Sequence, residues 1–156
     1  MSAVLTPPGL QSWVSFLRAH SAITRQLNAD LLNSHGLTLS DYEVLLRLAN
    51  AENEMMRRVD LAQSVLLTAS GITRLLDGLE RAGCVEKVAC KSDARVSYAK
   101  LTPAGRRKLK EAAETHLAGI EELFTGRYSD EELERLAELL ARLPLTNDIP
   151  DRCTVE

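Results

Sequence analysis

The chain has 156 residues, 45% hydrophobic and 26% charged, a composition typical of one globular domain with a sizeable core. No run approaches the roughly 18 apolar residues of a membrane span, and residues 1–10 lack a signal-peptide pattern, so we expect a cytoplasmic protein. Three cysteines and three scattered histidines argue against a disulfide framework and give no metal-ligand spacing, so neither a metal nor a cofactor is expected.

Apolar residues at steps of three and four predict a long first helix over about residues 9–33. Gly36 follows it and suits the left-handed conformation that ends many helices. A second helix is expected over about residues 40–50, because Thr38 and Asp41 form a capping-box pattern. Its buried face is predicted to comprise Val44, Leu45 and Leu48.

Two shorter helices joined by a tight turn come next. The third is predicted over about residues 59–65, and Thr68 or Ser70 is expected to cap a fourth that runs to Ala82, with Gly83 just past its end. The apolar face of this fourth helix consists of Ile72, Leu75, Leu76 and Leu79.

The period then changes from helical to alternating. Residues 85–89 and 96–101 are rich in β-branched and aromatic side chains and flank the polar run 91–95, a pattern that predicts a β-hairpin. Two helices, a tight turn and a hairpin form a winged helix-turn-helix. We therefore predict a mainly α fold with a small β-hairpin wing, the winged lobe spanning residues 36–101.

Two further helices are predicted after the hairpin. Thr102 and Pro103 begin a fifth helix that runs to about Gly126, and Ser129 with Glu132 caps a sixth over residues 130–143. The winged lobe is too small to cover the apolar stripes of the flanking helices. Residues 1–35 and 102–156 are therefore expected to pack on a second copy and form a homodimer. A compact monomer with these helices wrapped round the lobe is the alternative.

The charge of the chain is unevenly distributed. The formal net charge is −3, yet residues 55–110 hold 12 Lys/Arg and 5 Asp/Glu, a net charge of +7, which leaves −10 for the remainder. A basic segment on an acidic body is typical of nucleic-acid binding. The alternative is a chance fluctuation of surface charge.

The fourth helix and the hairpin tip carry the candidate DNA contacts. On the outer face of the helix, Ser70, Gly71 and Thr73 are small enough to let it enter the major groove, and Arg74 can bind guanine bidentately. The alternative is an ordinary solvated face.

At the hairpin tip, Lys91 and Arg95 suit DNA, Arg95 fitting the narrow minor groove. Asp93 is predicted to hold Arg95 by a hydrogen bond and aim it, an ordinary Asp-containing turn being the alternative.

Six short stretches stand in a specific order and spacing. They are LTLSDYEVL at 37–45, VDLA at 59–62, SGITRLLD at 70–77, LERAG at 79–83, DAR at 93–95 and LTPAGR at 101–106. Together they resemble the multiple antibiotic resistance regulator (MarR) family, and the flanking helices fit the dimerisation helices of that family. One departure is Ala94, where the family often has a second arginine.

The resemblance implies a dimeric repressor on a pseudo-palindromic operator of double-stranded DNA, released by a small aromatic or phenolic ligand. The predicted DNA-contacting residues are Thr68, Ser70, Gly71, Thr73, Arg74, Lys91, Asp93 and Arg95. The ligand site of the family lies between the dimer helices and the DNA-binding lobe, which Trp13, Arg18, His20 and Tyr42 can reach. Arg18 and Trp13 supply the cation and the ring that a phenolic carboxylate needs, whereas the alternative places Trp13 in the core and Arg18 on the surface.

Other functions find less support in the sequence. An enzyme is not expected, because no Gly-rich phosphate loop, nucleophile elbow or paired metal ligands occur. A winged-helix adaptor that docks proteins is the main rival. Cysteine-based redox sensing is another, with Cys84 expected to be buried and Cys90 to lie near the hairpin tip beside Lys91.

Overall fold

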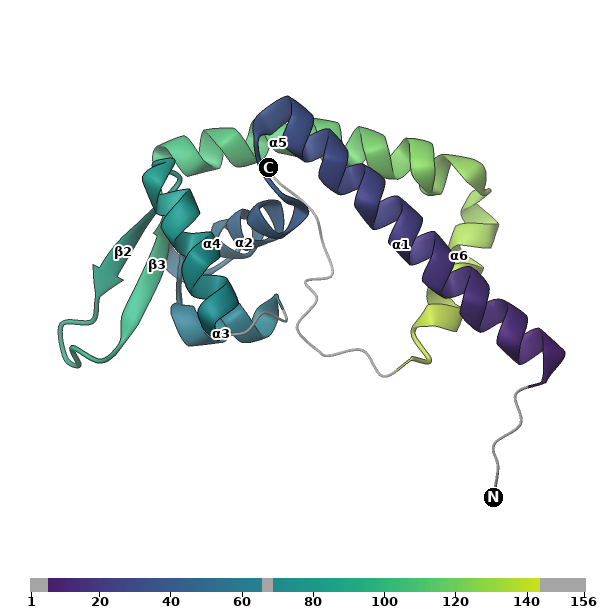
Figure 1. Ribbon diagram of the computed structural model, residues 1–156, viewed down its shortest axis with the longest axis horizontal. Helices are drawn as coiled ribbons and strands as arrows, with labels where there is room; N and C mark the ends of the chain where they lie inside the picture. Colours follow the sequence, from purple (N-terminus) through teal and green to yellow (C-terminus); the bar gives the residue numbers. More distant parts are fainter. Residues whose placement is uncertain (1–5, 66–68, 144–156) are drawn as a thin grey trace, which may run out of the picture.

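Helices and one small antiparallel sheet make up residues 6–65 and 69–143, the part of the chain that the computed structural model describes (Figure 1). In chain order the elements are α1 (Pro7–His35), α2 (Leu39–Ala49), the 3₁₀ turn η1 (Glu52–Glu54), β1 (Met55–Arg57), α3 (Arg58–Ser64), α4 (Ala69–Arg81), β2 (Val85–Ala89), β3 (Ser97–Leu101), α5 (Pro103–Leu123), the 3₁₀ turn η2 (Thr125–Arg127) and α6 (Asp130–Leu140). The predicted winged helix-turn-helix architecture is confirmed.

Side-chain caps determine where several helices begin. Thr38 Oγ1 accepts from the N–H of Asp41 at 3.0 Å, and the Asp41 carboxylate accepts from the N–H of Thr38 at 2.8 Å, so a capping box opens α2. Ser129 and Glu132 form the same arrangement at the start of α6. Both capping boxes predicted from the sequence are therefore present.

Several helix ends differ from the sequence prediction, among them the end of α1, which is His35 rather than Asn33. Helix α1 begins at Pro7 rather than near Gly9, because Thr6 accepts a hydrogen bond from the N–H of Gly9 at 3.2 Å and caps the helix earlier. Helices α5 and α6 stop short of the predicted ends at Gly126 and Leu143. In both places the backbone tightens into i→i−3 bonds, which end an α-helix.

The sheet has a third strand that the sequence did not predict. Its order is β1-β3-β2, and all pairs are antiparallel. The predicted hairpin is confirmed, with Val85 opposite Leu101 and Ala89 opposite Ser97. Strand β1 pairs Met55 with Lys100 along the other edge of β3. A strand of three residues is too short to show an alternating pattern, so only its pairing partner reveals it.

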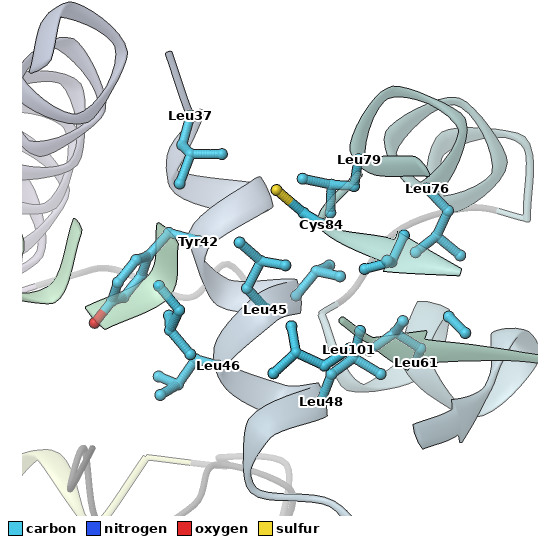
Figure 2. Packing of buried hydrophobic residues seen from close by; sticks show 14 of the residues in the cluster. Leu37, Tyr42, Leu45, Leu46, Leu48, Leu61, Leu76, Leu79, Cys84 and Leu101 are labelled. Carbon is cyan, nitrogen blue, oxygen red and sulfur yellow. The ribbon is translucent and has the colours of Figure 1, made fainter. Parts of the chain in front are cut away.

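The core is centred on α2 in the winged lobe, together with α3, α4 and the wing (Figure 2), and it extends to Leu31 of α1 and Leu109 of α5. Val44, Leu45 and Leu48 of α2 are fully buried, as predicted, and belong to the same cluster as Leu61 of α3 and Leu101 of β3. Burying five aliphatic side chains of this size contributes roughly 1.5–3 kcal/mol each relative to exposure. This cluster fixes the position of α4 against the wing.

Helix α5 connects the lobe to the other long helices. It starts at the base of the wing, passes over the lobe and packs along α1 (Figure 1). Where the two helices cross, a side chain at Gly119 would meet Leu27 Cδ2 at 2.7 Å, so glycine permits the close approach. Helix α6 buries no residue in the single chain. Among the described residues, no helix has the length and apolarity needed to span a membrane.

Candidate nucleic-acid interface

Helix α4 has one buried face and one exposed face. Ile72, Leu76 and Leu79 are each only 3% exposed and pack into the lobe core. Because a helix repeats every 3.6 residues, the intervening positions turn outward. The exposed positions include Ser70, Thr73, Arg74, Asp77 and Arg81, which we call the reading face, and Glu80 beside them. This matches the outer face expected from the sequence.

Helix α4 begins at Ala69 and is followed by a glycine turn that leads into the wing. Ala69 is its first residue, Ser70 is exposed and Gly71 is partly buried, while Thr68, the other predicted cap, lies outside the described residues. At the other end Gly83 adopts a left-handed φ of 75°, as the sequence predicted for the residue past the helix. The N–H of Cys84 then donates to the carbonyl of Leu79 at 2.9 Å, which leads the chain directly into β2.

The wing tip is a tight turn between β2 and β3 that presents basic side chains. Lys91 and Arg95 are both exposed. The N–H of Cys90 donates to the carbonyl of Val96 at 3.1 Å, which closes the hairpin beyond the last strand pair. The tip therefore holds two cations on a backbone fixed by the hairpin.

Asp93 stabilises the backbone of the turn and does not bond the guanidinium of Arg95. Its Oδ1 accepts a hydrogen bond from the backbone N–H of Arg95 at 2.9 Å, and its carbonyl accepts from the N–H of Val96 at 3.0 Å. This is an Asx turn, the alternative given by the sequence. The predicted hydrogen bond from Arg95 to Asp93 is present, but its donor is the backbone N–H of Arg95 rather than the guanidinium.

Cys84 and Cys90, the cysteines in the described part of the chain, lie in different environments on the wing. Cys84 is buried in the core, and burial raises the pKa of its thiol. Cys90 lies next to the tip, where Sγ is 3.2 Å from the Ser92 hydroxyl and this hydrogen bond lowers the pKa of the thiol. The burial of Cys84 and the place of Cys90 near the tip agree with the sequence expectation.

Three of the four predicted ligand residues lie on the exposed part of α1. Trp13 is 54% exposed, so it does not belong to the core of the single chain, and Arg18 and His20 are exposed as well. Phe16 links two of them, with ring centroids 6.3 Å from Trp13 and 6.4 Å from His20. These side chains form an open aromatic strip rather than an enclosed pocket.

Tyr42, the fourth predicted ligand residue, is buried elsewhere. It sits on α2 with its ring 4.5 Å from the ring of His116 on α5, and it is 3% exposed. Thr115 precedes His116 on α5, and its hydroxyl lies 2.7 Å from Nε2 of His35 at the end of α1. We call this meeting of α1, α2 and α5 the lobe junction. The structure therefore does not bring Tyr42 together with the α1 strip within one chain.

Two side chains at the site were not singled out by the sequence. Arg58, the first residue of α3, lies beside Asp77 of the reading face, with Nη2 and Oδ1 3.9 Å apart. His116 faces Tyr42, and burial lowers its pKa. Neither belongs to a motif, and each acquires its neighbour only through packing. The signal in the sequence for Arg58 is its positive charge just before the helix-turn-helix.

Comparison with known proteins agrees with this arrangement. The MarR family model matches residues 35–96, which include α2, α3, α4, β2 and the wing tip. A structure of AbsC, a MarR family transcriptional regulator from Streptomyces coelicolor, has 30% sequence identity and a TM-score of 0.83, covering 90% of this chain and 95% of AbsC. This chain belongs to the MarR family. The family predicted from the motifs is thereby confirmed.

Two other relatives extend the comparison. Sco3205, a MarR family regulator from Streptomyces coelicolor solved in complex with DNA, has 25% identity and a TM-score of 0.85, covering 91% of this chain and 89% of Sco3205. The transcriptional regulator MhqR of Bacillus subtilis is 28% identical over 141 residues, 90% of this chain and 94% of MhqR. These relatives are transcriptional regulators rather than enzymes.

Proposed function

We propose that this chain is a cytoplasmic transcriptional repressor that binds a pseudo-palindromic DNA operator as a homodimer and is released by a small aromatic or phenolic ligand. The observation that carries the proposal is the reading face of α4 beside a basic wing tip in one rigid lobe. A small polar helix face fits the major groove, and an arginine-tipped ribbon fits the minor groove.

Each contact residue has a physical role in this proposal. Thr68, Ser70, Gly71 and Thr73 let the start of α4 approach the DNA closely, and Arg74 reads a base. At the wing, Lys91 binds phosphate and Arg95 enters the minor groove, while Asp93 holds the turn that carries Arg95.

Two such lobes require a dimer. We propose that residues 1–35 and 102–156 dimerise and that residues 36–101 bind DNA. Large apolar side chains exposed in the flanking segments support this division, because a second copy would bury them away from water. Within residues 1–35 and 102–156 they are Leu10, Trp13, Phe16, Leu17, Leu32, Leu117, Tyr128, Leu139 and Leu143, counting the residues that the structure describes.

Selection from random DNA duplexes followed by binding measurements tests the DNA-binding role. The wild-type dimer should enrich an inverted repeat, and its affinity should fall steeply with salt because bound counterions are released. Arg74→Ala should relax the preference at one base pair of each half-site, whereas Arg95→Ala should weaken binding to all sequences alike. A protein-docking adaptor would show neither a repeat nor a steep salt dependence, and that result would overturn the proposal.

The ligand site is proposed around Trp13, Arg18, His20 and Tyr42. In one chain the α1 residues form an exposed strip and Tyr42 lies on α2, so we infer that dimerisation encloses the site. Arg18→Ala should abolish release from the operator by hydroxybenzoates while leaving DNA affinity unchanged. Arg25→Ala, which removes another exposed arginine of α1, is the matched control and should retain release. Loss of operator binding in Arg18→Ala would contradict the assignment.

Thiol oxidation is a second candidate signal, favoured by one observation. Cys90 carries a thiol of lowered pKa next to the wing tip, whereas the pKa of Cys84 is raised. If oxidation controls binding, peroxide should release wild type and Cys84→Ser but not Cys90→Ser. Release of Cys90→Ser by peroxide would remove this candidate.

A further inference from the structure

Asp77 is an acidic side chain on the face proposed to meet DNA. Asp77 lies one helical turn after Thr73 on the reading face, and its side chain is 54% exposed. DNA carries one negative charge per roughly 1.7 Å of its axis, so a carboxylate carried into the groove is repelled. Something must offset this charge if α4 is to enter the groove.

Arg58 is placed to provide that offset. It projects from the first turn of α3 towards α4, and its Nη2 is 3.9 Å from Asp77 Oδ1. Its side chain is only 21% exposed, in contrast to Asp77. Because the surrounding protein screens charge less than water does, the pair interacts more strongly than two fully exposed groups would.

The guanidinium also has no competing hydrogen bond at this nitrogen. Within the described residues, Arg58 Nη2 is buried and donates to no acceptor. It shares a shallow surface hollow with Glu80 of α4 and with Glu86 and Lys87 of β2. Because Nη2 has no acceptor to give up, the contact with Asp77 can shorten without breaking another bond at this nitrogen.

We propose that Arg58 is a positioning residue for the reading face: it neutralises Asp77 and holds that carboxylate away from the DNA phosphates. The proposal rests on the DNA-binding function proposed above. Arg58 itself touches neither base nor phosphate, and it acts through Asp77. The proposal depends on the contact between Arg58 and Asp77, which joins α3 to α4 across the helix-turn-helix.

The neighbouring residue supplies a matched control. Arg57 is also basic and adjacent in sequence, but its guanidinium binds Asp60 within the same turn, with Nε to Oδ2 at 2.7 Å and a second contact at 3.2 Å. Arg57→Gln therefore removes one positive charge from the same part of the lobe and leaves Asp77 and its partner intact.

A double-mutant cycle on the selected operator tests the proposal. Arg58→Gln should weaken operator affinity about tenfold, whereas Arg57→Gln should weaken it less than about threefold. Asp77→Asn should restore the affinity of Arg58→Gln to within about threefold of wild type, since it removes the charge that Arg58 offsets. The defect of Arg58→Gln should also shrink as salt rises, because salt screens the repulsion.

Other outcomes would overturn the assignment. A purely structural role predicts that Asp77→Asn fails to rescue Arg58→Gln, that the defect is independent of salt and that thermal stability falls in parallel. A base-reading role for Asp77 predicts that Asp77→Asn alone changes the preference at one operator position. If wild type and Arg74→Ala bind all duplexes alike, the proposed function itself fails, and the role of Arg58 fails with it.

Discussion

At the scale of single residues, short polar side chains shape the backbone that carries the larger functional ones. Asp93 illustrates this at the wing tip, where its carboxylate accepts the N–H of Arg95. The bond fixes the direction in which the chain leaves the turn, and hence where the guanidinium can reach. An Asx turn needs an acceptor oxygen, which aspartate and asparagine both supply.

Replacing Asp93 separates its geometry from its charge. Asp93→Ala should weaken operator binding about three- to tenfold, because Arg95 loses its fixed starting point and ordering it costs entropy. Asp93→Asn keeps the turn and should retain affinity. Fluorescence anisotropy on the selected operator measures both variants. Equal losses in the two variants would show that the charge matters instead of the turn.

At the scale of elements, the packing of α5 against the wing and against α2 sets the geometry of the lobe. A side chain at Gly105 would meet the carbonyl oxygen of Cys84 at 2.0 Å, so the start of α5 can lie against the start of β2 only with glycine there. Gly78 in α4 contrasts with it, since nothing lies within 4 Å of an added Cβ.

The two glycines should respond oppositely to alanine. Gly105→Ala should lower the free energy of unfolding by about 2–4 kcal/mol, because backbone must move to relieve the overlap. Gly78→Ala should raise it by about 0.5–1 kcal/mol, because alanine favours the helix and restricts the unfolded chain. Chemical denaturation followed by circular dichroism compares them. A neutral Gly105→Ala would contradict the close contact.

The contact between α5 and α2 should make stability depend on pH. Burial lowers the pKa of His116 in the folded chain below its ordinary value of 6.5. Above that pH the histidine is neutral in both states and has no effect. As the pH falls through about 6.5 the unfolded chain binds a proton first, so the folded state loses stability.

The measurement is the melting temperature between pH 7.5 and 5.5. Wild type should melt at lower temperature towards pH 5.5, and His116→Gln should lose part of that dependence. His20→Gln, which changes an exposed histidine of α1, should retain it. Equal pH profiles for wild type and His116→Gln would show that the ring adapts to the charge.

At the scale of the whole molecule, the exposed apolar stripes of the long helices predict how two copies meet. Phe16 is 43% exposed in the single chain, at the centre of the α1 strip. A charge there would have to be buried in the proposed dimer without a partner, which strongly disfavours association. Gln11 lies on the opposite side of the same helix and is exposed.

Phe16→Glu should therefore give a monomer at micromolar concentration by analytical ultracentrifugation. Its operator affinity should fall at least about 100-fold, because the second lobe is no longer held near its half-site. Gln11→Glu adds the same charge and should remain a dimer with wild-type affinity. A dimeric Phe16→Glu variant would move the interface away from the α1 strip.

The sequence by itself determined the positions of the helices, the hairpin and the reading face. These features depend on bonds and periodicities within a few residues. The capping boxes at Thr38 and Ser129 are of this kind, as is the alternation of Ile72 and Thr73 between the core and the surface. The order of short motifs then identified the family, since each motif marks one such local feature.

Tertiary structure alone decided which distant residues meet. Strand β1 forms because Met55 pairs with Lys100, and Arg58 acquires Asp77 only when α3 folds against α4. His35 and Thr115 are 80 residues apart in the chain, yet they form a hydrogen bond at the lobe junction. No local pattern encodes such pairs, because packing of the whole core sets the distance between them.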